Sequence, residues 1–150
     1  MKKVNVQNTI STTYAKVLKR IHKEGICPFC WQNFLRHHTR PIISKGRHWL
    51  LTDNFSPYPG TTHHLLIVSK YHVSHFSELP PAAHKELFAI ITPELTRRKV
   101  QGGGLFMRFG NGSYNMSSVG HLHAQVIVGV KRGKNTEMLM APLGFKKKAS

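Results

Sequence analysis

The chain has 150 residues, of which 40% are hydrophobic, and this is enough apolar material for a single domain over residues 1–150. Its 22 Lys and Arg against 6 Asp and Glu give a formal net charge of +16, which fits nucleic acid or free nucleotides as partners, or merely an organism that favours lysine. The longest apolar runs have the length of strands and fall short of the ~20 residues of a membrane span. The N-terminus lacks the apolar block of a signal peptide, so we expect a cytoplasmic protein with reduced thiols.

The first third of the chain predicts one helix, a cysteine-containing turn and two strands. Apolar residues at three- and four-residue spacing indicate a helix near Ser11 to Glu24, and Gly25 is a typical stop. The turn ICPFC follows. Short strands are expected at Pro41 to Ser44 and at Trp49 to Asp53, the second of which is rich in β-forming residues.

The middle of the chain predicts a loop, a buried strand and a second helix. FSPYPGTT reads as a loop because it combines two prolines, a glycine and small polar residues. HHLLIVS has the continuous apolar character of a buried strand. A helix is expected from about Ala82 to Ile91, and Pro93 should kink or break it.

The last two predicted strands are LFMRFG and HLHAQVIVGV, joined by NGSYNMSSVG. A connection this short suits antiparallel neighbours better than a crossover. The order of elements predicts an α+β fold, with an antiparallel sheet of about five strands and helices packed on one side. The motif-bearing core would span about residues 25–130, and a basic tail would occupy about 143–150.

The strand HLHAQVI carries polar side chains at every second position. His121, His123 and Gln125 would share one face of an extended chain, while the apolar residues between them share the other. Such a polar row favours a ligand or a metal. The alternative is that it merely lines a polar groove or faces solvent.

The run SSVGHLHAQVIVG resembles the signature of the histidine triad (HIT) superfamily, in which His-φ-His-φ-His-φ-φ lies on a strand after a Ser or Thr, here Ser118. The segments CPFC, DNFSPYPGTTHHLLIVSKYHV and MRFGNG also follow the order and spacing of that superfamily. The resemblance implies a HIT-like fold and a two-fold homodimer. The third histidine is replaced by Gln125, and HxHxQ is similar to the branch of galactose-1-phosphate uridylyltransferase and the diadenosine tetraphosphate phosphorylases.

The resemblance implies nucleotide chemistry at this strand. His123 would be the nucleophile that forms a covalent nucleotidyl-histidine intermediate, with Gln125 and Ser118 donating to phosphate oxygens. Since a glutamine cannot be protonated, the intermediate could wait for a phosphate acceptor, which makes a nucleotidyltransferase or phosphorylase, or react slowly with water as a hydrolase. The residues leave both open.

Cys27 and Cys30 have the spacing of a zinc-binding turn, and zinc requires two further ligands for tetrahedral closure. By resemblance these are His72 and His121, and a four-ligand site of this kind would be structural. Three nearby histidines could replace His72, namely His63, His64 and His75. The other interpretation of CPFC is a pair of reduced buried thiols.

Four further residues are candidates for substrate binding. By resemblance, Asp53 or Asn54 would contact ribose hydroxyls and Asn111 a phosphate, although each could simply cap a turn. Arg108 would bind a phosphate if it faces the site, and would otherwise be a surface arginine.

Two functions of other classes compete with an enzyme. The net charge of +16 favours a nucleotide- or nucleic-acid-binding module whose triad has decayed at Gln125, and such a module would bind without turnover. The cysteine turn favours an interaction protein held together by zinc. We expect no membrane partner.

Overall fold

The computed structural model describes residues 19, 21 and 23–148 of the chain. Residues 19, 21 and 23 are helical, which agrees with the end of the helix expected near Ser11 to Glu24. The remainder of that expected helix lies outside the described residues. Among the residues described, no helix is both long enough and apolar enough to cross a membrane.

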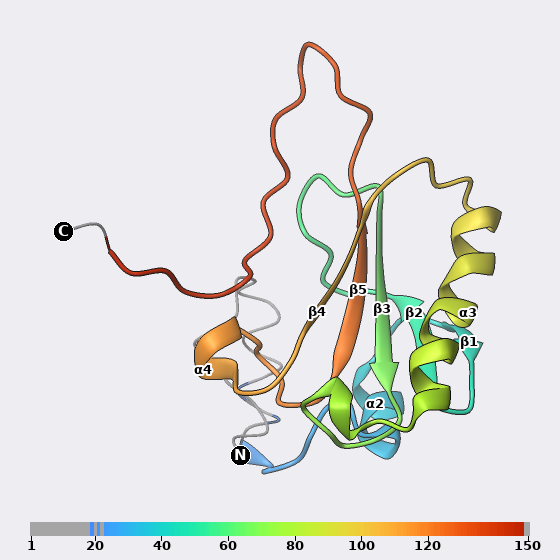
Figure 1. Cartoon of the computed structure of the whole chain (residues 1–150), viewed down its shortest axis with the longest axis vertical. Coiled ribbons are helices and arrows are strands. Elements are labelled where there is room, and N and C mark those ends of the chain that lie inside the picture. The colour runs from blue at the N-terminus through green and yellow to red at the C-terminus, as the bar shows by residue number, and fades with distance from the viewer. Residues whose placement is uncertain (1–18, 20, 22, 149–150) are drawn as a thin grey trace.

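A five-stranded sheet forms the centre of the molecule, with strand order β1-β2-β3-β5-β4, and every neighbouring pair is antiparallel (Figure 1). This confirms the expected α+β class and the antiparallel pairing of the last two strands. The elements in chain order are α2 Trp31–His37, β1 Ile42–Lys45, β2 Trp49–Asp53, β3 His63–Ser69, the 3-10 helix η2 Phe76–Glu78, α3 Pro81–Arg97, β4 Gly104–Arg108, α4 Gly112–Asn115 and β5 His123–Val128.

Alternation along the buried strands divides the core into two layers. On β3, Leu65 and Ile67 pack with the apolar side of α3, while Leu66 and Val68 point to the opposite face. That opposite face holds a smaller cluster, which includes Phe34 of α2 and the CPFC turn. The long helix therefore covers one face, and α2 adds a smaller helical layer on the other, which the sequence pattern did not indicate.

Helix α3 continues through Pro93 and ends at Arg97, so of the kink or break expected at Pro93, the break is wrong. The missing N–H of Pro93 removes one backbone bond, yet the turn that follows is held by side chains. The carboxylate of Glu94 is buried and accepts hydrogen bonds from Arg97 and Arg98. These contacts and the apolar packing of α3 on the sheet outweigh the lost bond.

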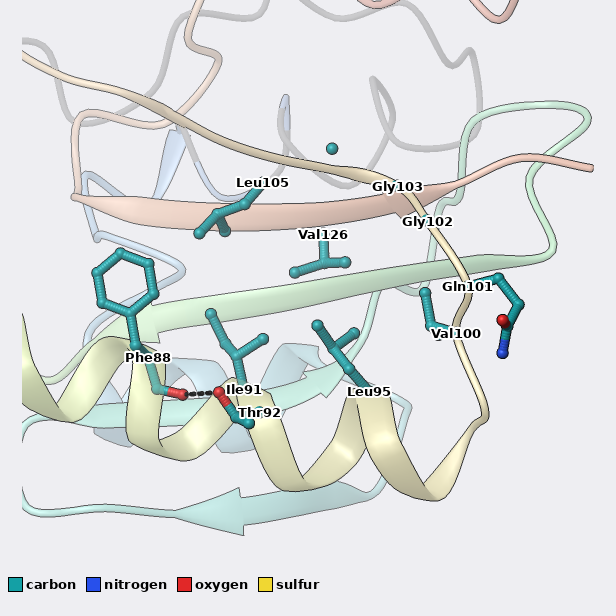
Figure 2. A pocket seen from close by; sticks show the side chains of 11 residues that line it. Phe88, Ile91, Thr92, Leu95, Val100, Gln101, Gly102, Gly103, Leu105 and Val126 are labelled. Carbon is teal, nitrogen blue, oxygen red and sulfur yellow. Dashed lines mark hydrogen bonds between the residues drawn. The ribbon is translucent and has the colours of Figure 1, made fainter.

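A groove lies between α3 and the edge strand β4 (Figure 2). Ile91 and Leu95 of α3 point into it towards Val126 of β5 and Leu105 of β4. Because Val126 belongs to the core layer beneath α3, this groove opens on the α3 face of the sheet. It is therefore separated by the sheet from the polar row of β5.

Candidate functional site

His123 and Gln125 lie on the face of β5 that is turned away from α3. His123 is directly opposite Val68 of β3 and Arg108 of β4, and Gln125 is opposite Leu66 and Phe106. Directly opposed residues of an antiparallel pair share a face, so Arg108 lies on the same side as His123. The sheet register thus places Arg108, a candidate from the sequence, next to the expected nucleophile.

His123 is held in one orientation by its neighbour in the chain. Its Nδ1 lies 2.8 Å from the backbone carbonyl oxygen of His121, to which it donates, so its Nε2 carries a bare lone pair. The side chain is only 6% exposed, and the ring of Phe29 packs edge-on at 4.9 Å. Burial lowers the pKa of His123 to about 4; the His121 carbonyl opposes this shift and the charge of Arg108 adds to it. The imidazole is therefore neutral at physiological pH.

Gln125 is held by His64, a residue whose role the sequence reasoning missed. The backbone N–H of Tyr58 donates to Nδ1 of His64 at 3.0 Å, so the ring proton is on Nε2 and is donated to Oε1 of Gln125 at 2.7 Å. Burial lowers the pKa of His64, and the bond to Gln125 partly offsets this. With Oε1 accepting, the amide N–H groups of Gln125 are left as donors for another group.

A sequence signal for His64 existed. In HHLLIVS, His64 shares its face with Leu66 and Val68, which pair with Gln125 and His123. Once β3 is paired with β5 in this register, His64 must lie on the face of the site. Asn54 reaches the same place, since its Nδ2 is 3.1 Å from Nε2 of His64 while its Oδ1 accepts from Ser56 N.

Arg108 reaches across the site from β4. Its Nη2 donates to the hydroxyl of Tyr58 at 3.1 Å, and its guanidinium lies over the ring of Phe106 with Cζ 4.9 Å from the ring centroid. Nε and Nη2 also donate to the carbonyl oxygen of Pro142, at 3.2 and 3.0 Å. Tyr58 therefore contacts both His64, through its backbone, and Arg108, through its hydroxyl.

The two cysteines and two histidines expected as metal ligands lie together. One ligand atom from each of Cys27, Cys30, His72 and His121 lies within 4.8 Å of the other three. The Cys27 Sγ to His121 Nδ1 distance is 3.4 Å, and Cys30 Sγ to His72 Nδ1 is 3.3 Å. Tetrahedral zinc with its usual bond lengths separates a sulfur and a nitrogen ligand by about 3.5 Å, so the cluster fits zinc.

The surroundings of His121 also suit a metal ligand. Its Nε2 donates to the carbonyl oxygen of Ser69 at 2.7 Å, which leaves Nδ1 bare and aimed at the cysteines. Burial is the main cause that lowers the pKa of His121 to about 4, and burial raises the pKa of Cys27 to about 12. A bound cation would offset the second effect by favouring the thiolate.

The alternative third ligands named from the sequence occupy other places. His64 binds Gln125, and Nδ1 of His75 accepts from the backbone N–H of Ser77 at the start of η2. His63 Nδ1 is 3.3 Å from Nη1 of Arg98. The cluster is therefore formed with His72.

Asp53 is not brought to the site. It follows Trp49 and Leu51 along the α3 side of β2, and its carboxylate is bound by two guanidinium nitrogens of Arg98, at 2.8 and 3.0 Å. Because the side chain of each second strand residue points to the same face, Asp53 lies on the opposite face from His123. The expectation of a ribose contact from Asp53 is therefore wrong, whereas Asn54 remains.

Asn111 and Ser118 lie in the connection between β4 and β5. Asn111 is exposed and its Oδ1 accepts from Ser113 N at 2.9 Å, which is the local capping role at the start of α4. Ser118 is half-buried in the turn that leads to His121. The next residue, Val119, packs in the cluster with Cys27 and Phe29.

Comparison with solved structures shows the fold of the chain. No family model and no curated protein matches the chain. Among solved structures, a histidine triad nucleotide-binding protein from Candida albicans has a TM-score of 0.53 at 12% identity, covering 70% of this chain and 82% of that one. A Zn-bound histidine triad family protein from Mycobacterium smegmatis has a TM-score of 0.51 at 19% identity, with coverages of 75% and 83%.

A HIT family hydrolase from Clostridium thermocellum is similar at a TM-score of 0.50 and 20% identity, covering 71% of this chain and 91% of that one. The protein therefore has the fold of histidine triad proteins, as the motifs led us to expect.

Proposed function

We propose that this protein is a HIT-type nucleotide-processing enzyme that acts on a nucleoside phosphate anhydride, ester or phosphoramidate through a nucleotidyl-His123 intermediate. The observation that carries the proposal is the bare Nε2 of a buried His123, whose ring is held by the His121 carbonyl beside Arg108. The fold, shared with proteins named as HIT hydrolases and nucleotide-binding proteins, supports it.

The chemistry follows from these groups. The lone pair on Nε2 of His123 attacks the phosphorus, a P–N bond forms, and the P–O or P–N bond to the leaving group breaks with its electron pair. The guanidinium of Arg108 and the amide N–H groups of Gln125 are donors for the non-bridging oxygens, on which charge grows in the transition state. Ser118 is a further candidate donor, and Asn54 a candidate contact for the sugar.

The second half of the reaction decides between transferase and hydrolase. Neither Gln125 nor its partner His64, which already donates its Nε2 proton, offers an acid comparable to a third histidine. We therefore favour transfer of the nucleotidyl group to a phosphate or sugar-phosphate acceptor, as the HxHxQ pattern suggests. Water as the acceptor is the competing outcome.

We further propose that Cys27, Cys30, His72 and His121 hold a structural zinc ion. Four protein ligands leave no position for a reacting water, so the ion would cross-link the N-terminal turn to the strand of the nucleophile. The Zn-bound protein of the same fold supports this assignment.

A homodimer and a cytoplasmic location remain proposals. Among the described residues, β4 pairs with no strand on its outer side, and the neighbouring Phe88 of α3 is 60% exposed, so a second copy would extend the sheet at this edge. The alternative function, a module that binds nucleotides or nucleic acid without turnover, draws its support from the net charge of +16.

Intact-protein mass spectrometry tests the proposal directly. Wild type, His123→Ala and the matched control His84→Ala, an exposed histidine on α3, are incubated with dinucleoside polyphosphates, nucleoside diphosphate sugars and adenosine phosphoramidate. A nucleotidyl mass increment on wild type and His84→Ala, but not on His123→Ala, supports His123 as the nucleophile. If the increment persists until phosphate is added, it supports a transferase over a hydrolase. No adduct and no product with any substrate, together with salt-sensitive nucleic-acid binding, would favour the binding module.

A further inference from the structure

The C-terminal part of the chain returns to the candidate site after leaving β5. In Figure 1 the segment beyond β5 turns back and runs down towards α4. Residues 138–145, which we call the strap, contact other described parts of the chain at Gly129, Arg108 and Tyr114. Leu139 lies beside Gly129, the Pro142 carbonyl accepts from Arg108, and Gly144 lies against the backbone of Tyr114 in α4.

The Pro142 carbonyl occupies an edge of the Arg108 guanidinium that could bind a phosphate. Both Nε and Nη2 donate to the single carbonyl oxygen of Pro142, at 3.2 and 3.0 Å. This edge of a guanidinium is one of those that grip two oxygens of a phosphate. A neutral oxygen of the chain thus sits where an oxygen of a nucleotide phosphate would be bound.

Within the part of the chain that the structure describes, the strap is held by few interactions. Met138 and Met140 are 82% and 74% exposed, and Leu143 and Phe145 are exposed as well. Within residues 131–148, only Ala141 and Pro142 are half-buried, so the contact with Arg108 is the best covered part of the segment. Little apolar surface is removed from water here, and little free energy is therefore lost when the strap leaves.

An anionic phosphate competes well for such a contact. The bond from the guanidinium to the Pro142 carbonyl has one charged partner, whereas a phosphate adds the attraction of its own negative charge and accepts both N–H groups on separate oxygens. Arg108 can exchange the Pro142 carbonyl for a phosphate while its Nη2 keeps the contact with the Tyr58 hydroxyl.

We propose that residues 138–145 form a displaceable strap over the phosphate side of the site, and that a nucleotide phosphate replaces the Pro142 carbonyl on Arg108. The proposal rests on the proposed function, since it takes Arg108 as a phosphate ligand. In the free protein the strap competes with nucleotide and lowers its apparent affinity.

Two glycine substitutions test the role of the strap, one that displaces it and one that serves as a control. A Cβ added at Gly144 would lie 2.6 Å from the carbonyl oxygen of Tyr114, so Gly144→Ala forces the strap away from α4. A Cβ added at Gly133, in the same C-terminal segment, meets nothing within 4 Å, so Gly133→Ala is the matched control. Neither glycine belongs to the proposed catalytic or metal-binding groups.

The experiment measures AMP affinity by calorimetry and strap mobility by methyl NMR of Met138 and Met140 in the full-length protein. We expect Gly144→Ala to bind AMP about threefold or more tightly than wild type and Gly133→Ala to match wild type. AMP should narrow both methionine signals in wild type, and in Gly144→Ala they should be narrow from the start. Arg108→Ala should narrow them too while weakening AMP binding.

Two negative results have different meanings. Wild type can bind AMP while Gly144→Ala has the same affinity and the methionine signals do not respond. In that case the proposal that nucleotide displaces the strap is refuted, and the proposed function stands. If AMP binds to none of these variants, the nucleotide site itself is refuted, and the strap's role with it.

Discussion

Removal of the proposed zinc ion should destabilise the protein strongly, because its proposed ligands come from distant parts of the chain. Cys30 and His72 are 42 residues apart, and Cys27 and His121 are 94 apart. We consider chelation of the wild type and the substitutions Cys27→Ser and His121→Ala. The matched control is His75→Ala, a histidine of the same region that lies outside the cluster.

The size of the effect follows from loop closure. Closing a 42-residue loop in the unfolded chain costs about 4 kcal/mol of conformational entropy, which a cross-link removes. The 94-residue loop overlaps it, so we count the smaller value alone. For a chain of this length, a loss of about 4 kcal/mol lowers Tm by roughly 10 °C.

Metal analysis and thermal unfolding check this together. We expect one equivalent of zinc in wild type and His75→Ala, much less in Cys27→Ser and His121→Ala, and a drop in Tm of roughly 10 °C on chelation of the wild type. The reasoning fails if purified wild type carries less than about half an equivalent of zinc while chelator leaves Tm unchanged.

Three further predictions concern single side chains. His64→Ala leaves Gln125 without its partner and should reduce kcat about tenfold while zinc content stays unchanged, as steady-state kinetics and metal analysis would report. Asp53→Asn should lower Tm without raising KM for nucleotide, since Arg98 and not the site holds Asp53; a raised KM would restore the ribose role. Glu94→Gln should lower the free energy of unfolding by about 2 kcal/mol at pH 7. Hydrogen bonds from Arg97 and Arg98 lower the pKa of Glu94 from 4.5 to about 2, so this stability is present above pH 4.5 and is lost as the pH falls towards 2. Urea unfolding of both proteins at several pH values would show the difference vanish in acid.

The sequence predicted those parts of the site that lie within short motifs. HxHxQ places His123 and Gln125 on one face of β5 by strand alternation, although His121 precedes the strand, and CPFC needs only a turn, so these parts could be predicted from residue spacing. The strands around Trp49 and in HHLLIVS were likewise evident from continuous apolar runs flanked by turn residues.

Contacts that depend on register between strands were not accessible in the same way. His64 reaches Gln125 because β3 and β5 pair with Leu66 opposite Gln125, and a shift of one residue would point it away. The ribose contact expected from Asp53 is wrong for a related reason. Side chains alternate between the two faces of β2, and Asp53 lies on the face that packs against α3. The helix runs beyond its expected end near Ile91 because the turn after Pro93 is held by hydrogen bonds to Glu94, which a rule for proline alone does not include.

His121 contacts two groups through different atoms. Its imidazole lies among the metal-ligand candidates, while its backbone carbonyl selects which nitrogen of His123 is bare. If zinc fills the cluster, removal of the metal or oxidation of the cysteines also loosens His121, whose carbonyl orients the proposed nucleophile His123. The proposed nucleotide chemistry at His123 would then depend on the metal and thiol status of the surroundings.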